Sequence, residues 1–363
     1  MSTENNRLFE SYDLNGIHLK NRAVMAPMTR SRATSDHVPT EIMAAYYGQR
    51  SGAGLIITEG TSPSPNGSGY PRIPGIYTEE QTEAWKKITE AVHEDDAKIF
   101  LQIMHTGRVS HPLNMEEEAQ VLSSSAVAAE STKMYTDQEG PQPLPIPKAM
   151  AQKDIDHAIE EYVTASRNAV EAGFDGVELH GANGYLIEQF INPSCNQRED
   201  KYGGSAENRS RFVIEVAEKV AAAIGKEKVG IRLSPHGAFN DIHPFDNEEE
   251  TFAHLAEKLK EIGLTYIHLV DHSGMGTPTV PVELKTAIRD TFGGTIILSG
   301  GYDHEKAEKD LADGLGHLVA FGRPFLANPD LLERFKKGAD LNAPHFDTFY
   351  TPGEKGYIDY PLI

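Results

Sequence analysis

The sequence predicts an α/β protein that folds as a (β/α)8 barrel, also called a TIM barrel. Eight short apolar runs lie at 23–29, 55–60, 98–105, 176–182, 229–234, 266–270, 295–301 and 317–323. Continuous apolar runs without alternation are typical of parallel strands buried on both faces. Helical patterns lie between them, near 79–93, 152–172, 206–223, 248–261, 281–291, 304–312 and 329–337. Strands that alternate with helices in this number close into a barrel. No composition shift marks a boundary, so we expect one domain over residues 1–363.

Two segments do not fit the bare repeat of strand and helix. Residues 8–22 hold Asn15-Gly16 between two short alternating runs, which predicts a β-hairpin that caps the amino-terminal end of the barrel. Residues 106–150, with a proline-dense stretch at 140–147, form a gap of about 45 residues after the third strand, too long for an ordinary connection. Because this long loop follows a strand, we expect it to lie over the carboxyl-terminal face as a partial lid. We expect the aromatic tail at 345–360 to fold against the same face.

The charge of the chain argues against two classes of partner. Acidic residues outnumber basic ones by 54 to 34, which gives a formal net charge of −20. A field of that sign repels phosphate backbones and anionic lipid, so we expect no nucleic-acid partner and no membrane partner. The longest apolar runs are far shorter than the ~18 residues of a membrane span. The sequence also opens without a basic region followed by an apolar stretch, so we expect a cytoplasmic protein.

Several common chemical motifs are absent from the sequence. The single cysteine, Cys195, excludes an internal disulfide, a four-cysteine iron–sulfur cluster and a cysteine-rich zinc site, and we expect it to be an inert thiol. A G-x-G-x-x-G pattern that begins at Gly52 and Gly54 fails at Ile57. No H-E-x-x-H or G-x-S-x-G is present either. We therefore expect no metal site, no Rossmann module and no serine triad.

The ends of the last two strands suggest a phosphate site. In this fold the loops after the seventh and eighth strands bind phosphate through converging backbone N–H groups. Glycines here allow close approach of the anion, and an arginine can pair with it in a bidentate manner. The residues concerned are Ser299, Gly300, Gly301, Gly322 and Arg323. The alternative is that these glycines only satisfy tight turns.

The end of the fourth strand carries a second group of polar residues. His180 and Asn183 offer two hydrogen-bond donors that can polarise one carbonyl oxygen or stabilise a developing enolate. Tyr185 follows, and a phenol can donate a proton to carbon once negative charge has built up there. The alternative is a histidine that is hydrogen-bonded to backbone at the end of a strand.

An ordered set of segments resembles the Old Yellow Enzyme family of flavin-dependent ene-reductases. The matching stretches are APMTR at 26–30, QIMHTGR at 102–108, GVELHGANGYLIEQFINPSCNQREDKYGGSAENRSRF at 176–212, SGGYD at 299–303 and FGRPFLANPDL at 321–331. The resemblance runs in register from about residue 8 to residue 361. It implies that the barrel holds noncovalent FMN and that NADPH reduces this flavin, with NADH as a possible hydride donor. It also implies that an electron-poor alkene, such as an α,β-unsaturated carbonyl, a maleimide or a nitro compound, is reduced at the same site.

The resemblance assigns roles to residues one by one. Thr29 matches a threonine that bonds the flavin C4 carbonyl, and Gln102 and Arg232 match the residues at its pyrimidine edge. His180 and Asn183 match the pair that binds the substrate oxygen, and Tyr185 matches the proton donor. The remaining expected cofactor contacts are Pro27, Met28, Gly60, Ser299, Gly300, Gly301, Gly322 and Arg323.

Other features bear on the branch of the family and on competing interpretations. Thr29 resembles the branch with yeast Old Yellow Enzymes, plant oxophytodienoate reductases and bacterial N-ethylmaleimide reductases. Met104 stands where many bacterial relatives have tryptophan and is expected to open the substrate pocket, which Tyr70 and Tyr357 are expected to line. The competing hypotheses are a barrel aldolase or isomerase, which would need a Schiff-base lysine or metal carboxylates, and a flavin-binding sensor without turnover. Both a monomer and a homodimer remain open.

Overall fold

The computed structural model describes residues 6–363, and its centre is a closed barrel of parallel strands. Neighbouring strands pair in chain order, and the last pairs with the first. The eight strands are β3 (Ala23–Met25), β4 (Leu55–Ile57), β5 (Lys98–Ile103), β10 (Gly176–Gly181), β11 (Val229–Leu233), β12 (Tyr266–Val270), β13 (Thr295–Ser299) and β14 (Leu318–Phe321). The predicted (β/α)8 barrel is therefore confirmed. Most strands end one to four residues earlier than predicted, because their last small and polar residues already belong to loops.

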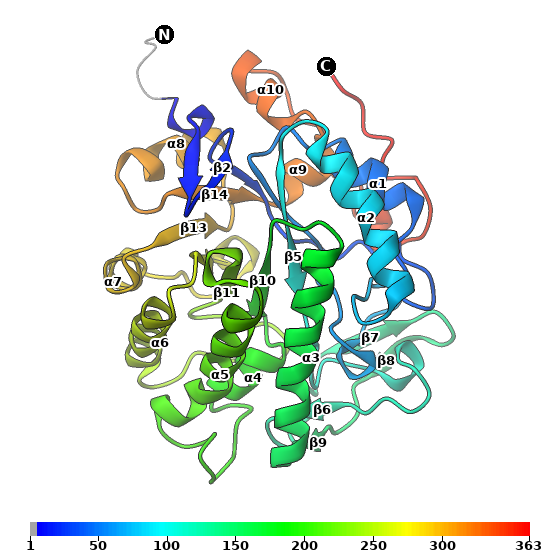
Figure 1. The fold of residues 1–363 in the computed structure, drawn as a ribbon, viewed down its shortest axis with the longest axis vertical. Helices are drawn as coiled ribbons and strands as arrows, with labels where there is room; N and C mark the ends of the chain where they lie inside the picture. The colour runs from blue at the N-terminus through cyan, green and yellow to red at the C-terminus, as the bar shows by residue number, and fades with distance from the viewer. Residues whose placement is uncertain (1–5) are drawn as a thin grey trace.

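Helices surround the barrel, as Figure 1 shows. The predicted ones are α2 (Glu79–His93), α3 (Gln152–Glu171), α5 (Ala206–Ile224), α6 (Glu248–Ile262), α7 (Val282–Phe292), α8 (His304–Ala312) and α10 (Leu331–Lys337). Three short helices were not predicted: α1 (Glu41–Gly48), α4 (Leu186–Ile191) and α9 (Arg323–Ala327). Every residue of α4 is buried, so it has no polar face to produce an amphipathic pattern. Single 3-10 turns lie at η1 (Arg7–Phe9), η2 (Pro65–Gly67), η3 (Pro112–Asn114), η4 (Lys226–Lys228), η5 (Ser273–Met275) and η6 (Phe346–Thr348).

The predicted hairpin closes the amino-terminal end of the barrel. Strands β1 (Tyr12–Leu14) and β2 (Ile17–Leu19) pair antiparallel through Asn15 and Gly16, both of which have positive φ, as the tightest hairpin turns require. Leu14 and Leu19 are fully buried against the inward-facing residues at the bottom of the barrel. The hairpin therefore acts as a plug, and it leaves the opposite end of the barrel for the functional site.

The long segment after β5 contains more regular structure than the sequence predicts. Strands β6 (Leu122–Ser123) and β9 (Lys148–Ala149) pair in parallel, and β7 (Lys133–Thr136) and β8 (Gly140–Pro143) form an antiparallel hairpin. Half of the proline-dense stretch is thus a strand; β8 pairs on one side only, where proline is tolerated. Met134 and Leu144 pack in one apolar cluster with Tyr70 and Tyr185. This contact confirms that the segment partly covers the carboxyl-terminal end of the barrel.

The core lies mainly between the outer faces of the strands and the helices that pack on them. None of the helices in residues 6–363 is long and apolar enough to cross a membrane. Within the same residues, no cluster of three or more histidine, cysteine or acidic side chains could hold a metal ion. The sequence was expected to open without a basic region followed by an apolar stretch, and the first five residues of that opening lie outside the described part of the chain.

Candidate active site

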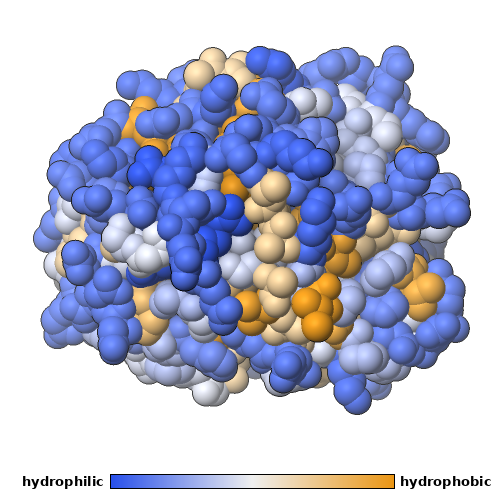
Figure 2. Space-filling model, turned by 90° about the horizontal axis from the view of Figure 1, so that it is seen from below, coloured by the Kyte–Doolittle hydropathy of each residue, from blue (hydrophilic) through white to orange (hydrophobic). Residues whose placement is uncertain are grey.

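A cavity of about 840 Å³ opens at the carboxyl-terminal ends of the barrel strands. Strand β5 points downward in Figure 1, so Figure 2, seen from below, shows this end of the molecule; apolar side chains gather near the middle of the face within a hydrophilic surface. Twelve of the predicted site residues line the cavity: Pro27, Met28, Thr29, Tyr70, Asn183, Tyr185, Arg232, Ser299, Gly300, Gly301, Gly322 and Arg323. Residues of the tail, Phe346, Phe349 and Tyr350, line it as well, which confirms that the tail folds against this face.

One end of the cavity is shaped by glycines. Gly300 has a φ of +119°, and a Cβ at this position would lie 1.8 Å from the carbonyl oxygen of Asp271. No side chain fits there, so the loop after β13 presents bare backbone to the cavity. Arg323 begins α9 at the mouth of the same region, with its guanidinium 5.4 Å from the ring of Phe346. Bare backbone beside an arginine suits a phosphate group.

The cavity wall includes a buried arginine that has no hydrogen-bond partner within residues 6–363. Arg232 on β11 is 6 % exposed, its Nε has no hydrogen-bond partner among the described residues, and no donor of its guanidinium is paired with protein there. Burial lowers the pKa of Arg232, and the nearby Glu178 counteracts that effect. A buried guanidinium with free donors is costly unless a ligand satisfies it. The pyrimidine edge of a flavin carries carbonyl oxygens that would do so, and the residues present therefore fit FMN.

A buried polar network supports this part of the cavity wall from behind. Gln102 on β5 donates from Nε2 to Glu178 Oε1 at 2.8 Å, and His268 Nδ1 lies 2.8 Å from Glu178 Oε2. Gln102 lies behind the cavity wall and not among the lining residues. Glu178 and His268 were not among the residues predicted from the sequence. The available signal was the position of Glu178, two residues before His180 on one strand, which places both side chains on the same face.

The residues that were predicted to bind the substrate lie together at the end of β10. His180 is 3 % exposed, and its ring centroid lies 4.8 Å from that of Tyr185. The N–H of Ala182 donates to His180 Nδ1 at 3.3 Å, so the proton of the neutral ring sits on Nε2, which is left to donate. Burial lowers the pKa of His180 well below its usual range, with a smaller contribution from the positive charge of Arg232. His180 is therefore a neutral donor at working pH.

The hydroxyl of Tyr185 lies in a similarly dry place. It is 2.9 Å from the hydroxyl of Tyr70, and burial raises the pKa of Tyr185 to about 12. Burial also raises the pKa of Tyr70 well above its usual value. Both phenols therefore remain protonated at neutral pH, and each can pass a proton to the other.

The turn that carries Asn183 is held by residues that the sequence analysis missed. Asn183 and Gly184 both have positive φ, at +60° and +77°. Glu188 on α4 accepts the N–H of Gly184 at 2.6 Å and the hydroxyl of Ser234 at 2.8 Å, and Ser234 Oγ accepts the N–H of Asn183 at 3.0 Å. Burial raises the pKa of Glu188 to about 7. These contacts join loops that are distant in sequence, so no local pattern indicates them.

Two expected lining residues lie elsewhere. Tyr357 does not reach the cavity; it is fully buried and stacks on Tyr46, with ring centroids 4.0 Å apart, and Tyr350 of the same tail lines the cavity in its place. Met104 does not form part of the cavity wall either. It packs behind Gly60, where a Cβ would lie 2.4 Å from the Met104 sulfur. Tyr357 belongs to the tail, for which the sequence gives no register relative to the strands. Met104 directly follows β5 and stays in one apolar cluster with Tyr70 and Tyr185, but its side chain turns toward Gly60 and away from the cavity.

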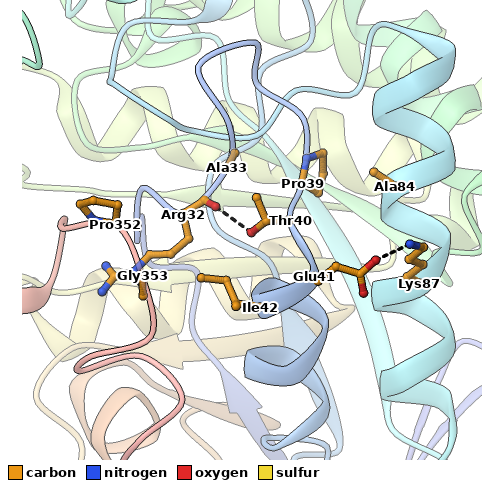
Figure 3. Close-up of a pocket in the computed structure, with 10 residues that line it drawn as sticks. All are labelled: Arg32, Ala33, Pro39, Thr40, Glu41, Ile42, Ala84, Lys87, Pro352 and Gly353. Carbon is orange, nitrogen blue, oxygen red and sulfur yellow. Dashed lines mark hydrogen bonds and ion pairs between the residues drawn. The ribbon is translucent and has the colours of Figure 1, made fainter.

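A second cavity, of about 570 Å³, lies between α1, α2 and the tail and is shown in Figure 3. Its polar groups pair with one another: Thr40 Oγ1 donates to the carbonyl of Arg32 at 2.8 Å, and Glu41 forms an ion pair with Lys87. No nucleophile or unpartnered donor faces it among its lining residues. We therefore regard it as a surface groove without chemistry of its own.

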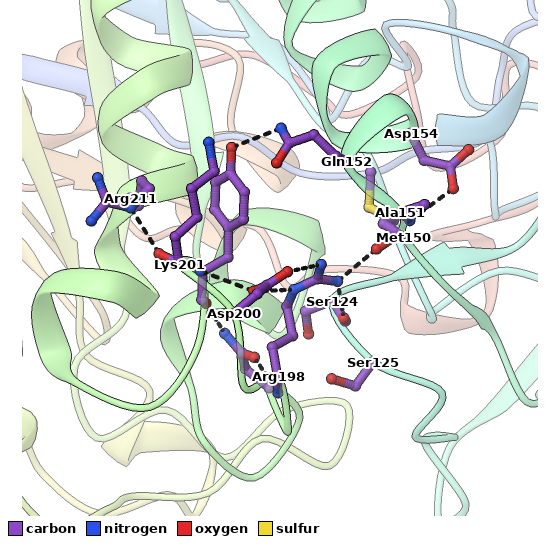
Figure 4. A network of polar contacts seen from close by, with 12 residues as sticks. Ser124, Ser125, Met150, Ala151, Gln152, Asp154, Arg198, Asp200, Lys201 and Arg211 are labelled. Atoms are coloured by element: carbon purple, nitrogen blue, oxygen red, sulfur yellow. Dashed lines mark hydrogen bonds and ion pairs between the residues drawn. The ribbon is translucent and has the colours of Figure 1, made fainter.

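The second half of the matching stretch 176–212, around Arg198, Asp200 and Gly203, has a structural role. Arg198 donates to the carbonyls of Ser124 at 2.9 Å and Met150 at 2.6 Å, and it pairs with Asp200 (Figure 4). A Cβ on Gly203 would lie 2.0 Å from the carbonyl oxygen of Arg198, so this glycine permits the close turn. The network ties the loop after α4 to the long segment that follows β5, at Ser124 within it and at Met150, its last residue.

Comparison with known proteins agrees with this geometry. Residues 7–342 match the model of the NADH:flavin oxidoreductase / NADH oxidase family. The chain is 43% identical over 365 residues to 12-oxophytodienoate reductase 1 of Oryza sativa subsp. japonica, covering 98% of this chain and 93% of the relative. It is 42% identical over 353 residues to a probable flavin mononucleotide-dependent alkene reductase of Leishmania infantum, covering 96% and 95%.

Solved structures show the same similarity. Morphinone reductase superposes with a TM-score of 0.95 at 43% identity, covering 100% of this chain and 98% of that one. The Old Yellow Enzyme homologue from Zymomonas mobilis superposes with a TM-score of 0.93 at 40% identity, covering 98% and 99%.

The barrel and its glycine-lined cavity, together with the matching family model and relatives, identify a flavin-dependent oxidoreductase. This chain belongs to the NADH:flavin oxidoreductase / NADH oxidase family, and the resemblance to the Old Yellow Enzymes is confirmed.

Proposed function

We propose that this protein is an NAD(P)H-dependent ene-reductase that reduces electron-poor carbon–carbon double bonds. The observation that carries the proposal is the group formed by His180, Asn183 and Tyr185. Asn183 and Tyr185 line the cavity, and the neutral ring of His180 lies 4.8 Å from that of Tyr185, so two neutral donors and a protonated phenol come together. The substrate class is that of α,β-unsaturated carbonyl, maleimide and nitro compounds, because each has an oxygen that can accept hydrogen bonds while the double bond is reduced.

We assign the cofactor contacts to the residues of the expected set. Arg232 would hold the pyrimidine edge of noncovalent FMN, and Thr29 its C4 carbonyl. Gln102, which was expected at the same edge, would support it from behind the cavity wall through Glu178. Pro27, Met28 and Gly60 would lie along the ring, and Ser299, Gly300, Gly301, Gly322 and Arg323 would bind the phosphate. When bound, FMN accepts two electrons from NADPH, or from NADH, and supplies them as hydride to the β-carbon of the alkene.

The protein residues complete the addition. As hydride arrives, negative charge moves to the activating oxygen, where the N–H groups of His180 and Asn183 stabilise it by roughly 2–4 kcal/mol for each well-placed donor. Tyr185 then breaks its O–H bond and protonates the α-carbon, so the alkene gains one hydride and one proton. Tyr185 recovers a proton from Tyr70, whose hydroxyl is 2.9 Å away, and the partly exposed Tyr70 takes its own from solvent.

The test separates the two half-reactions in the variant Tyr185→Phe. We expect reduction of the flavin by NADPH to be nearly unchanged and reduction of the bound alkene to slow by about 10²–10⁴, the usual contribution of a positioned general acid. Both rates are measured by anaerobic stopped-flow absorbance with cyclohexenone as the alkene.

Tyr135→Phe is the matched control, because Tyr135 is an exposed tyrosine on β7 in the long segment after β5. It should leave both half-reactions at wild-type rates. An equal loss of both rates in Tyr185→Phe would remove Tyr185 from the role of proton donor.

A further inference from the structure

His272 is a polar side chain of the cavity wall that takes no part in the proposed mechanism. His272 lies directly after Asp271 in the loop that follows β12, and it lines the cavity together with Asn183. Its Nε2 is 2.7 Å from Oδ1 of Asn183. The two residues are 89 positions apart in the sequence, so the contact joins the loops at the ends of two different barrel strands.

The contact matters because an asparagine amide has a donor end and an acceptor end. With Oδ1 engaged by the N–H of His272, Nδ2 is the end that remains for a ligand, and no protein acceptor is recorded for it among residues 6–363. The opposite orientation would turn Oδ1 toward the ligand and place it against the substrate oxygen. Two acceptors would then face each other, which repels and leaves developing negative charge without a donor.

The backbone of Asn183 is already fixed by other groups. Its N–H donates to Ser234 Oγ at 3.0 Å, and its carbonyl accepts from Asn240 Nδ2 at 2.8 Å. These bonds hold the residue in its left-handed conformation, but neither of them touches the side-chain amide. The remaining freedom is the rotation of the amide itself, and the contact with His272 is the one that selects its direction.

The surroundings of His272 hold its ring in place and keep it neutral. Its ring packs edge-on against Phe239, with centroids 4.5 Å apart. Burial and the positive charge of Arg232 lower the pKa of His272 to about 4, and the opposing effect of Asp271 is smaller. The ring is therefore neutral at working pH and carries a single proton. A proton on Nε2 is the one that forms a hydrogen bond with Oδ1 of Asn183.

We infer that His272 is a positioning residue that orients the amide of Asn183, so that the substrate oxygen meets a donor. This inference rests on the proposed function, because it assumes that Asn183 binds the oxygen of the ligand. It predicts that His272 acts on ligands only through Asn183.

The test is a double-mutant cycle read out by the affinity for phenol, whose oxygen probes the same donors. The variants are His272→Leu, Asn183→Gly, which removes the amide and tolerates the positive φ, and the double variant. Affinities are measured by calorimetry on the flavin-loaded protein and by the charge-transfer band. We expect His272→Leu to weaken phenol binding by about tenfold, the effect of one lost hydrogen bond. In the Asn183→Gly background the same change should have no further effect.

Two further variants separate positioning from packing. His272→Gln keeps an N–H donor at this place and should restore most of the lost affinity. His254→Leu removes a histidine on α6, outside the cavity, and should leave the affinity unchanged. If His272→Leu weakens binding equally with and without Asn183, or has no effect, the inference is wrong. If Asn183→Gly itself binds phenol as tightly as the wild type, then the proposed substrate site is wrong, which is a different outcome.

Discussion

The residues around the site show how strongly burial alone sets protonation. Glu59, at the end of β4, is fully buried; it accepts the N–H of Arg30 at 3.1 Å and the hydroxyl of Tyr47 at 3.3 Å. Desolvation raises the pKa of Glu59 to about 7, because these two bonds compensate only part of the cost of burying the charge. Glu188 has the same value for the same reason. Carboxyl groups of this kind make the stability of the fold depend on pH.

The direction of that dependence follows from proton binding. In the unfolded chain Glu59 loses its proton near its ordinary pKa of 4.5, whereas in the folded protein it keeps it to about pH 7. The folded state therefore binds more protons between these values, and the contribution of Glu59 to stability falls as pH rises from about 4.5 through 7. The loss is on the order of 3 kcal/mol.

We predict that Glu59→Gln, which cannot ionise, gains stability relative to the wild type as pH rises. The free energy of unfolding, measured by urea denaturation, should shift in favour of the variant by about 2–3 kcal/mol between pH 5 and pH 8. Glu80→Gln, an exposed substitution on α2, should show almost no such shift. Parallel profiles for the wild type and Glu59→Gln would contradict the buried, protonated state of Glu59.

At this scale the sequence predicts residues at the ends of strands well and their supporting partners poorly. The places of Asn183, Tyr185 and Arg232 in the cavity wall could be predicted because the barrel brings the ends of its strands to one face, and His180 lies beside Tyr185 for the same reason. The supports, such as Glu188 and His272, could not. They act through contacts between segments far apart in the chain, and these are set only when the barrel closes.

At the scale of elements, the strands and the amphipathic helices could be predicted from the sequence. For the loops, the sequence predicted where they lie but not the regular structure within them. The apolar runs that predict β10 and β13 depend on burial alone, and α3 has a continuous apolar stripe. The segment at 106–150 was expected above the carboxyl-terminal face, and it lies there, but its two small sheets depend on tertiary contacts. Arg198 attaches it to the second half of the matching stretch 176–212, so this half of the stretch has a structural role.

We predict that Arg198→Ala loosens this segment while the barrel stays folded. The variant loses two charge-assisted hydrogen bonds, to the carbonyls of Ser124 and Met150, and the cost should be about 2 kcal/mol, or a few degrees in Tm. Limited proteolysis should show faster cleavage within residues 106–150, and calorimetry gives the change in Tm.

Arg211→Ala is the matched control for this prediction. Arg211 donates to the carbonyl of Lys201 at 2.7 Å in the same motif, and no recorded contact of its side chain reaches the 106–150 segment. Cleavage of that segment at equal rates in the two variants would show that Arg198 does not hold it.

At the scale of the whole molecule, the barrel is closed at one end by the hairpin and partly covered at the other by the long segment and the tail. Arg30, Arg32 and Arg50 are buried and donate to backbone carbonyls of the tail, among them those of Phe349 and Tyr357. Contacts that run from one end of the chain to the other support our proposal that it acts as a single domain. The large cavity at the carboxyl-terminal ends of the strands remains open, and a flavin and a second small molecule can meet there.

The measurement that tests the proposed function most directly is the visible spectrum of the purified protein under anaerobic conditions. It is recorded first alone, then after NADPH, and then after cyclohexenone. We predict an oxidised-flavin band that bleaches with NADPH and returns with the enone, because one cavity serves both half-reactions. A protein that stays colourless when FMN is supplied would contradict the cofactor assignment, and a reduced flavin that the enone leaves bleached would contradict the reduction of alkenes.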